Sequence, residues 1–184
     1  TQQKWAQAMN TANMVMNSGQ YNLSTPYNTI FGEEGENSKE SIFEVQARAD
    51  AINPTSQGIQ YTNLQGVRGA GPWDLGWGWN SPSANLAAAY EPNDPRRART
   101  ILFTSTPTTP GVTIYGEVTP IGLPNPRYNH KVHTNPATRA AVGNRFGWWN
   151  NVRILRYADV VLMYAEAANE LGGANNITAA KAAL

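Results

Sequence analysis

Residues 156–167 read RYADVVLMYAEA, and the apolar residues of this stretch recur at the spacing of one helical face. The pattern extends over residues 154–171, where a wide apolar face leaves only a narrow strip of charged side chains. A helix with so narrow a polar strip packs against neighbours on more than one side. Gly172-Gly173 ends it, because glycine adopts left-handed backbone conformations without penalty, and another helical pattern begins at Asn176. We therefore expect residues 151–184 to form a helix–turn–helix unit of the tetratricopeptide kind.

The rest of the chain holds shorter patterns separated by loops. Apolar residues at helical spacing predict a helix, and alternation of apolar and polar residues predicts a strand. A capping hydroxyl or carboxylate followed by proline predicts a helix start. The predicted elements are a helix over residues 3–17, strands over residues 41–47 and 112–118, a short helix opened by Ser81-Pro82, a second opened by Asp94-Pro95, and an extended segment over residues 101–103. Residues 53–83 have no period, and residues 120–136 form a proline-rich loop.

Composition excludes several classes of function. The 184 residues carry 14 basic and 13 acidic side chains, a formal net charge of +1, and nucleic-acid binding needs a clustered basic excess. The absence of cysteine excludes disulfides, thiolate zinc sites and Fe–S clusters. No run approaches the 18 or so apolar residues that a membrane-spanning helix needs. The chain has no initiator Met and stops inside a helical pattern, so we expect it to be part of a longer protein.

Four stretches, in order, resemble the SusD/RagB family of Bacteroidetes outer-membrane lipoproteins. Residues 156–167 closely resemble the family signature RYADVLLMYAEA of its C-terminal region. The other matching stretches are SGQYNL at residues 18–23, NSKESIFEV at residues 37–45, and GWGWNSP at residues 76–82 followed by Leu86, Tyr90 and Asp94-Pro95-Arg96. Together the four matches cover most of the chain.

This resemblance implies a mainly α-helical, SusD-like fold with tetratricopeptide-type helix pairs, a loop-rich C-terminal region and a few short strands. The chain would be a single C-terminal portion of such a domain. Its parts would be a helix of the tetratricopeptide-type region in residues 1–23, a loop-rich subregion in residues 37–150 and a truncated helix pair in residues 151–184. Family members are anchored on the cell surface at the outer membrane through an upstream lipidated cysteine.

The resemblance also implies a function. Members bind oligosaccharides, or peptides in RagB-like relatives, and pass them without chemistry to a SusC-like TonB-dependent transporter. Glycan binding and delivery are therefore expected here. The alternatives left open are peptide binding, and a scaffold or transporter-contact role with the ligand held by upstream sequence.

Residues 61–80 hold the side chains that suit a carbohydrate site. Sugar rings stack their apolar C–H faces on indoles, while amides and guanidinium groups bond hydroxyls at the ring edge. The candidate ligand-binding residues are Trp73, Trp77, Trp79, Tyr61, Arg68, Asp74 and Asn80. Trp77 and Trp79 lie in the run that resembles a family-wide segment, which favours a packing role for them. Trp73 lies just outside that run and is the best candidate for stacking on a ligand.

Other chemistries find weaker support in the sequence. A glycoside hydrolase would need two carboxylates flanking the aromatic loop, and Asp74 with Glu91 or Asp94 are the nearest, but each has a structural explanation. His130 and His133 lack a nearby carboxylate, which favours a solvated loop over a metal site. Residues 66–71 are rich in glycine but lack the Lys and Ser/Thr of a phosphate-binding loop. We expect no catalytic residue, metal, cofactor or nucleic-acid partner.

Overall fold

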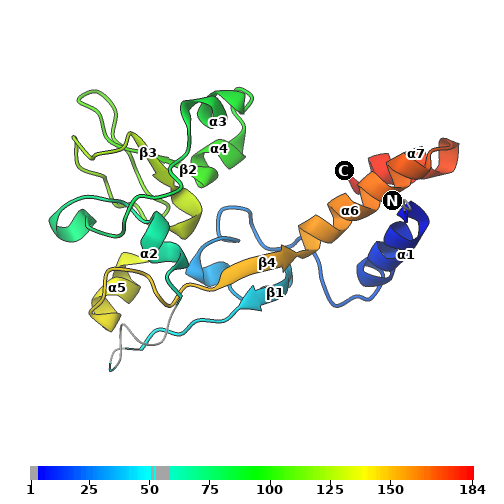
Figure 1. Ribbon diagram of the computed structural model, residues 1–184, viewed down its shortest axis with the longest axis horizontal. Coiled ribbons are helices and arrows are strands. Elements are labelled where there is room, and N and C mark those ends of the chain that lie inside the picture. Colours follow the sequence, from blue (N-terminus) through cyan, green and yellow to red (C-terminus); the bar gives the residue numbers. More distant parts are fainter. Residues whose placement is uncertain (1–3, 51, 53–58) are drawn as a thin grey trace. The chain divides into compact units, whose positions relative to one another are not determined.

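The computed structural model describes residues 4–50, 52 and 59–184. These residues divide into two compact units, whose elements are labelled in Figure 1. Unit 1 comprises residues 4–26, 37–44 and 153–184, and unit 2 comprises residues 27–36 and the described residues between 45 and 152. The predicted helix start at Gln3 and part of the predicted aperiodic stretch, residues 53–58, lie outside the described residues.

Unit 1 is helical. Among its described residues the helices are α1 (Trp5–Met16), α6 (Tyr157–Leu171) and α7 (Ala174–Ala183), and α6 packs against both others. Small side chains at buried positions allow the helix backbones to approach closely. These are Ala12, Ala165, Ala167, Ala168 and Ala180. The prediction that the helix carrying RYADVVLMYAEA packs on more than one side is therefore confirmed.

The predicted start of this helix is wrong by three residues. Residues 154–156 belong to strand β4 (Val152–Arg156), which pairs with β1 (Ser41–Val45). Arg156 is extended and is the N-cap residue of α6, where its backbone N–H donates to Asp159 Oδ2 at 2.8 Å. Its guanidinium donates to Glu40 Oε1 at 2.7 Å. Asp159 thus ends the strand and starts the helix. Helix α7 also begins two residues earlier than predicted.

Strand β1 turns the side that carries Ile42 and Glu44 inward. Glu44 is buried and pairs with Arg153 at 3.6 Å, whereas Phe43 and Val45 are exposed. Phe43 and Val45 share a face, as alternation predicts, but Ala47 lies beyond the end of the strand. The Glu44–Arg153 pair therefore lies on the inner side of β1, which also carries the half-buried Ile42.

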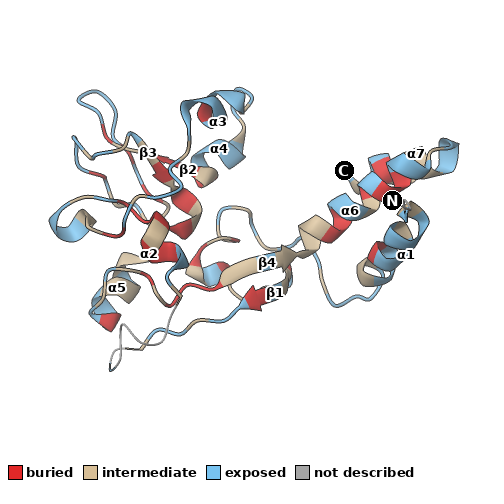
Figure 2. Ribbon diagram, in the orientation of Figure 1, coloured by how far each residue is buried: buried red, intermediate tan, exposed pale blue. Residues whose placement is uncertain are grey.

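Unit 2 consists of short elements around a small core. Strand β2 (Ile101–Phe103) pairs antiparallel with β3 (Arg127–Asn129), with Leu102 opposite Tyr128. Val67 and Leu75 complete the core cluster with these two residues, and Figure 2 shows the buried positions in red. The helices of unit 2 in its described residues are α2 (Tyr61–Gln65), α3 (Ala84–Ala89), α4 (Pro95–Thr100) and α5 (Pro136–Val142), with 3₁₀ turns at Glu33–Gly35, Gly71–Trp73 and His130–Val132. The mainly helical fold with a few short strands is as predicted.

Two predicted elements of unit 2 need correction. Residues 112–118 form a tight turn instead of a strand, with a single bridge between Val112 and Val118. Gly116 adopts φ +80°, and the Thr113 hydroxyl accepts the N–H groups of the reversing chain, so the segment turns back on itself. Helix α3 begins after Ser83, whose hydroxyl accepts from the Leu86 N–H at 3.0 Å. The start at Asp94-Pro95 is confirmed.

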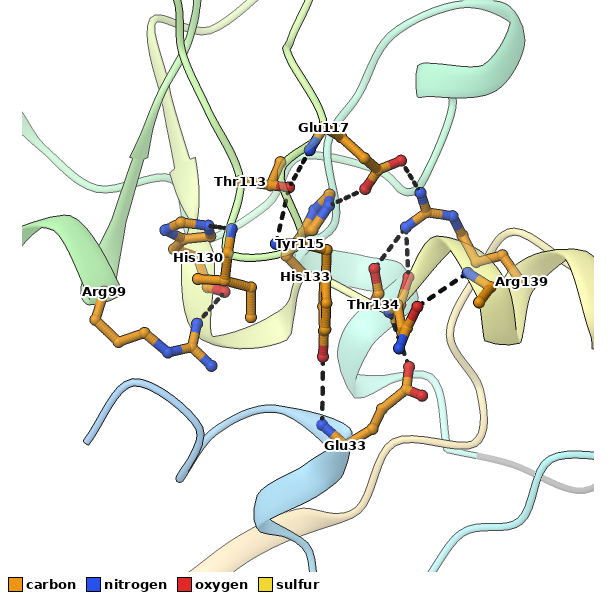
Figure 3. A network of polar contacts seen from close by, with 12 residues as sticks. Glu33, Arg99, Thr113, Tyr115, Glu117, His130, His133, Thr134 and Arg139 are labelled. Atoms are coloured by element: carbon orange, nitrogen blue, oxygen red, sulfur yellow. Dashed lines mark hydrogen bonds and ion pairs between the residues drawn. The ribbon is translucent and has the colours of Figure 1, made fainter. Parts of the chain in front are cut away.

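Two partly buried carboxylates hold the loops of unit 2 together (Figure 3). Glu117 accepts from His133 Nε2 at 2.8 Å and from the Arg139 guanidinium, and these partners lower its pKa although burial opposes this. Glu33 accepts from the Asn135 N–H at 2.9 Å and from Trp149 Nε1 at 3.0 Å. These hydrogen bonds join loops that lie as far apart in the sequence as residues 33 and 149, without a continuous apolar core between them.

The predicted solvated loop around His130 and His133 is wrong, because both imidazoles are buried. His130 Nδ1 lies 2.7 Å from the Ala98 carbonyl, and Nε2 accepts from the Ile114 N–H at 3.0 Å. The neutral imidazole with its proton on Nδ1 therefore makes a hydrogen bond at each ring nitrogen. Burial lowers the pKa of His130 to about 4. The pKa of His133 is also lowered, mainly by burial.

The close packing of α6 gives a first prediction. Ala168 is fully buried, so Ala168→Leu should lower the free energy of unfolding by about 1–3 kcal/mol through overpacking. Ala6 is exposed on α1, so Ala6→Leu should change it by less than about 0.5 kcal/mol. Urea denaturation followed by circular dichroism measures both. Equal effects of the two substitutions would contradict the packing described.

The buried His130 gives a second prediction, on pH. The unfolded imidazole binds a proton below about pH 6.5, whereas the folded one stays neutral to about pH 4. The unfolded state therefore binds more protons in this window, and stability falls as the pH falls, with up to about 1.4 kcal/mol per pH unit from this one group. Urea denaturation at several pH values between 7 and 4 measures this slope. His130→Asn, which keeps an amide donor and acceptor, should reduce it, and an unchanged slope would contradict the role given to His130.

Candidate functional site

The candidate site is built on two segments of unit 2 that run side by side. Residues 63–67 cover the end of helix α2 and the two residues after it, and residues 75–79 follow the 3₁₀ turn Gly71–Trp73. Four backbone hydrogen bonds of 2.9–3.0 Å join them, donated by Leu75, Trp77, Gly78 and Trp79 to the carbonyls of Val67, Asn63, Gly66 and Leu64. A Cβ at position 76 would lie 2.2 Å from the Asn63 carbonyl oxygen, so only glycine allows this approach.

Trp77 and Trp79 project from the second segment into solvent. Their side chains are 56% and 59% exposed, and their ring centroids lie 6.4 Å apart with the planes tilted by 43°. Gly78 lies between them with φ +69°, a left-handed conformation that glycine adopts readily, so the backbone turns here. The contact between the two rings shows that both side chains lie together. We call this pair the Trp77–Trp79 platform.

Polar side chains surround the base of the platform. Gln65 Oε1 accepts from Asn80 Nδ2 at 2.7 Å and from Asn129 Nδ2 at 2.9 Å. A Cβ at Gly78, between the two indoles, would lie 3.0 Å from Arg68 Cβ and 3.2 Å from Asn125 Nδ2. Arg68 and Asn80 are exposed. Amide side chains thus lie at the base of the platform, and the exposed Arg68 starts beside Gly78.

Trp73 and Asp74 occupy different environments from the platform. Trp73 is half-buried against the core cluster and stacks on His133, with ring centroids 6.1 Å apart and planes at 25°. Asp74 Oδ2 accepts from Arg145 at 2.6 Å. Trp73 therefore has the packing role that was expected of Trp77 and Trp79. Trp77 and Trp79 are instead the exposed indoles, as was expected of Trp73. Tyr61 is exposed at the start of α2.

Sequence reasoning missed Asn125 and Asn129 as neighbours of the platform. Both come from the stretch expected to be a proline-rich loop, and the β2–β3 pairing, which fixes Asn129 opposite Ile101, brings them there. A three-residue strand gives almost no sequence pattern, so no local signal could have found these two amides.

The platform can bind a flat apolar surface with a polar edge. The two indoles offer ring faces, and the neighbouring amides and guanidinium offer donors and acceptors. Within the described part of the chain, no group of three or more His, Asp or Glu residues is arranged to hold a metal ion. No helix among the described residues is both long and apolar enough to cross a membrane.

Comparison with solved structures finds similar folds. Surface glycan-binding protein A from Bacteroides thetaiotaomicron matches with a TM-score of 0.70 and 22% identity over 96% of this chain and 41% of that one. The same protein in complex with laminarihexaose matches with a TM-score of 0.68 and 23% identity over the same shares of the two chains. Surface glycan-binding protein A from Bacteroides uniformis gives 0.71 and 21% over 98% of this chain and 36% of that one. The chain thus spans about two fifths of the length of these proteins.

Sequence comparison agrees on the family. No curated protein matches the chain significantly. The model of the SusD family matches residues 39–184, which include three of the four stretches that carry the resemblance in full or nearly so. Because this match covers most of the sequence, the chain belongs to the SusD family, as its sequence predicted.

Proposed function

We propose that the chain is the C-terminal portion of a surface protein that binds a glycan on the Trp77–Trp79 platform. The whole protein would hold the glycan without cleaving it and deliver it to a SusC-like TonB-dependent transporter. The observation that carries glycan binding is the pair of adjacent, exposed indoles on a backbone fixed by four hydrogen bonds.

Rigidity of the backbone is the first support. A binding surface that is already ordered loses less conformational entropy when the ligand binds. The backbone hydrogen bonds and the close approach at Gly76 fix the main chain that carries both indoles. Exposing two large aromatic side chains to water is unfavourable for folding alone, and such patches mark binding surfaces.

The structural neighbours are the second support. One of them is a surface glycan-binding protein in complex with laminarihexaose, an oligosaccharide. The neighbours are surface proteins of Bacteroides, which supports the same location for this protein. Lipid anchoring through an upstream cysteine at the outer membrane, and transporter contact through tetratricopeptide-type helices such as the α6–α7 pair, follow from the family resemblance.

A binding role without catalysis agrees with the carboxylates near the aromatic loop. Asp74 pairs with Arg145, and Asp94 caps α4 and pairs with Arg96. Both carboxylates are bound to arginines, whereas a glycosidase needs one carboxyl of raised pKa to donate a proton. The pKa of Asp94 is lowered by its hydrogen bonds from Arg96, which is the opposite direction.

Removal of both indoles tests the platform. Trp77→Ala with Trp79→Ala should weaken glycan affinity at least about tenfold, because stacking area is lost from an exposed site while the fold is kept. Isothermal titration against a panel of neutral oligosaccharides that includes laminarihexaose measures this, beside a panel of peptides. Phe43→Ala, which removes another exposed aromatic ring, should leave affinity unchanged. Unaltered binding in the Trp variant would make this portion a scaffold, and binding of peptides alone would replace the glycan.

The absence of a covalent step has its own test. Prolonged incubation of the protein with each bound oligosaccharide should release no new reducing ends above the buffer control. Any turnover that scales with protein concentration would contradict the non-catalytic role.

A further inference from the structure

A second concave surface lies in unit 2. This groove has a volume of about 530 Å³, within the range of about 300–1,000 Å³ of small-molecule sites. It runs between the segment at Tyr27, the α3–α4 corner and the 3₁₀ turn His130–Val132. Its principal lining residues are Tyr27, Leu86, Tyr90, Glu91, Arg96 and Lys131. We call it the Tyr27–Tyr90 groove.

The apolar part of the groove is fixed in place. The Tyr27 ring meets the Phe31 ring edge to face with centroids 5.8 Å apart, and Lys131 Nζ lies 4.0 Å from the Phe31 centroid. Helix α3 buries Ala87, whereas Leu86 is 42% exposed and lines the groove. An exposed leucine and two tyrosines give the groove an apolar surface that the core of unit 2 does not use.

The polar part of the groove centres on Arg96. The Asp94 carboxylate accepts hydrogen bonds from two nitrogens of this guanidinium. Nε lies 3.0 and 3.1 Å from the two carboxylate oxygens, and Nη2 lies 2.6 Å from Oδ2. The pair uses the Nε–H and one Nη2–H, and among the described residues no other acceptor takes the remaining three of the five N–H groups. Asp94 raises the pKa of Arg96, with weaker contributions from Tyr27 and Tyr90, whose phenols line the same groove.

The charges of the groove balance. Glu91 and Asp94 carry two negative charges, and Arg96 and Lys131 carry two positive ones. A balanced lining offers no net attraction to an ion, while oriented donors, acceptors and two aromatic rings suit a neutral molecule with many hydroxyls. We propose that the Tyr27–Tyr90 groove is a second site for a neutral oligosaccharide, so that unit 2 holds a glycan at two points. The proposal rests on glycan binding as the function, but not on the platform.

Two sites on one unit have a measurable consequence. Trp79 and Leu86 are seven residues apart, so their Cα atoms lie within about 25 Å of each other. A long glycan that engages both sites gains from the high effective concentration at the second site, whereas a short one binds each site separately. Polysaccharide should therefore bind more tightly than hexasaccharide, and the difference should depend on the groove.

Stoichiometry tests the proposal. In isothermal titration with laminarihexaose, maltohexaose and xylohexaose, the native protein should bind two equivalents of the hexasaccharide that it accepts. Leu86→Ala with Arg96→Ala, and separately Trp77→Ala with Trp79→Ala, should each leave one equivalent, and the four substitutions together should leave none. The groove variant should also weaken binding of the parent polysaccharide at least about tenfold.

A matched control and clear contrary outcomes complete the design. Ile121→Ala with Arg48→Ala removes another exposed aliphatic side chain and another arginine paired with an aspartate, and should bind as the native protein does. Unfolding midpoints equal to native show that the variants fold. One equivalent for the native protein and for the groove variant, with equal affinity, overturns the groove and leaves the platform. Loss of all binding in the groove variant but not in the platform variant overturns the platform instead. Binding of none of the three hexasaccharides overturns both.

Discussion

The approach of residues 75–79 to residues 63–67 is the constraint on which the candidate site depends. Four backbone hydrogen bonds and the missing side chain at Gly76 hold these segments together, and the two indoles stand on the solvent side of one of them. The same approach places Leu75 and Val67 in the core cluster with Leu102 and Tyr128. One local contact therefore supports both the small core of unit 2 and the surface proposed for binding.

Unit 2 compensates for its small core with partly buried polar contacts. Glu33 and Glu117 each collect several donors from loops that are far apart in sequence (Figure 3). The Tyr128 hydroxyl, on a fully buried ring, donates to the Arg68 carbonyl at 2.8 Å. Such networks fix loops in one arrangement because every unmade bond would leave a buried polar group unsatisfied. A binding surface built on loops needs this kind of support.

The sequence predicted those elements of the fold that have a strong periodic pattern of apolar residues. The helix around residues 157–171 has a strong period, and the RYADVVLMYAEA stretch carried the family assignment. Its start was misplaced because Arg156 is fixed as a cap by Asp159 and Glu40, and Glu40 lies more than a hundred residues away in sequence. Residues 112–118 alternate apolar and polar side chains as a strand does, but they form a turn. The chain reverses because Gly116 has a positive φ and the Thr113 hydroxyl accepts the N–H groups of Tyr115 and Glu117.

The candidate site was predictable in composition but not in exposure. Sequence located the aromatic loop, yet whether an indole packs or projects depends on partners that the loop meets in space. Trp73 packs because His133 and the core lie beside it, and His133 is fixed there by Glu117. Asn125 and Asn129 reach the platform only through β3. Contacts of this range leave no periodic trace in the sequence.

The most direct measurement of the central claim is an NMR titration. An oligosaccharide that the full protein binds is added stepwise, and the six indole N–H resonances are recorded at each step. The Trp77 and Trp79 signals, assigned by single substitution, should shift in a saturable way, while the signal of buried Trp149, whose N–H is held by Glu33, should stay unchanged. Saturable binding that leaves the Trp77 and Trp79 signals in place would contradict a glycan site on the platform.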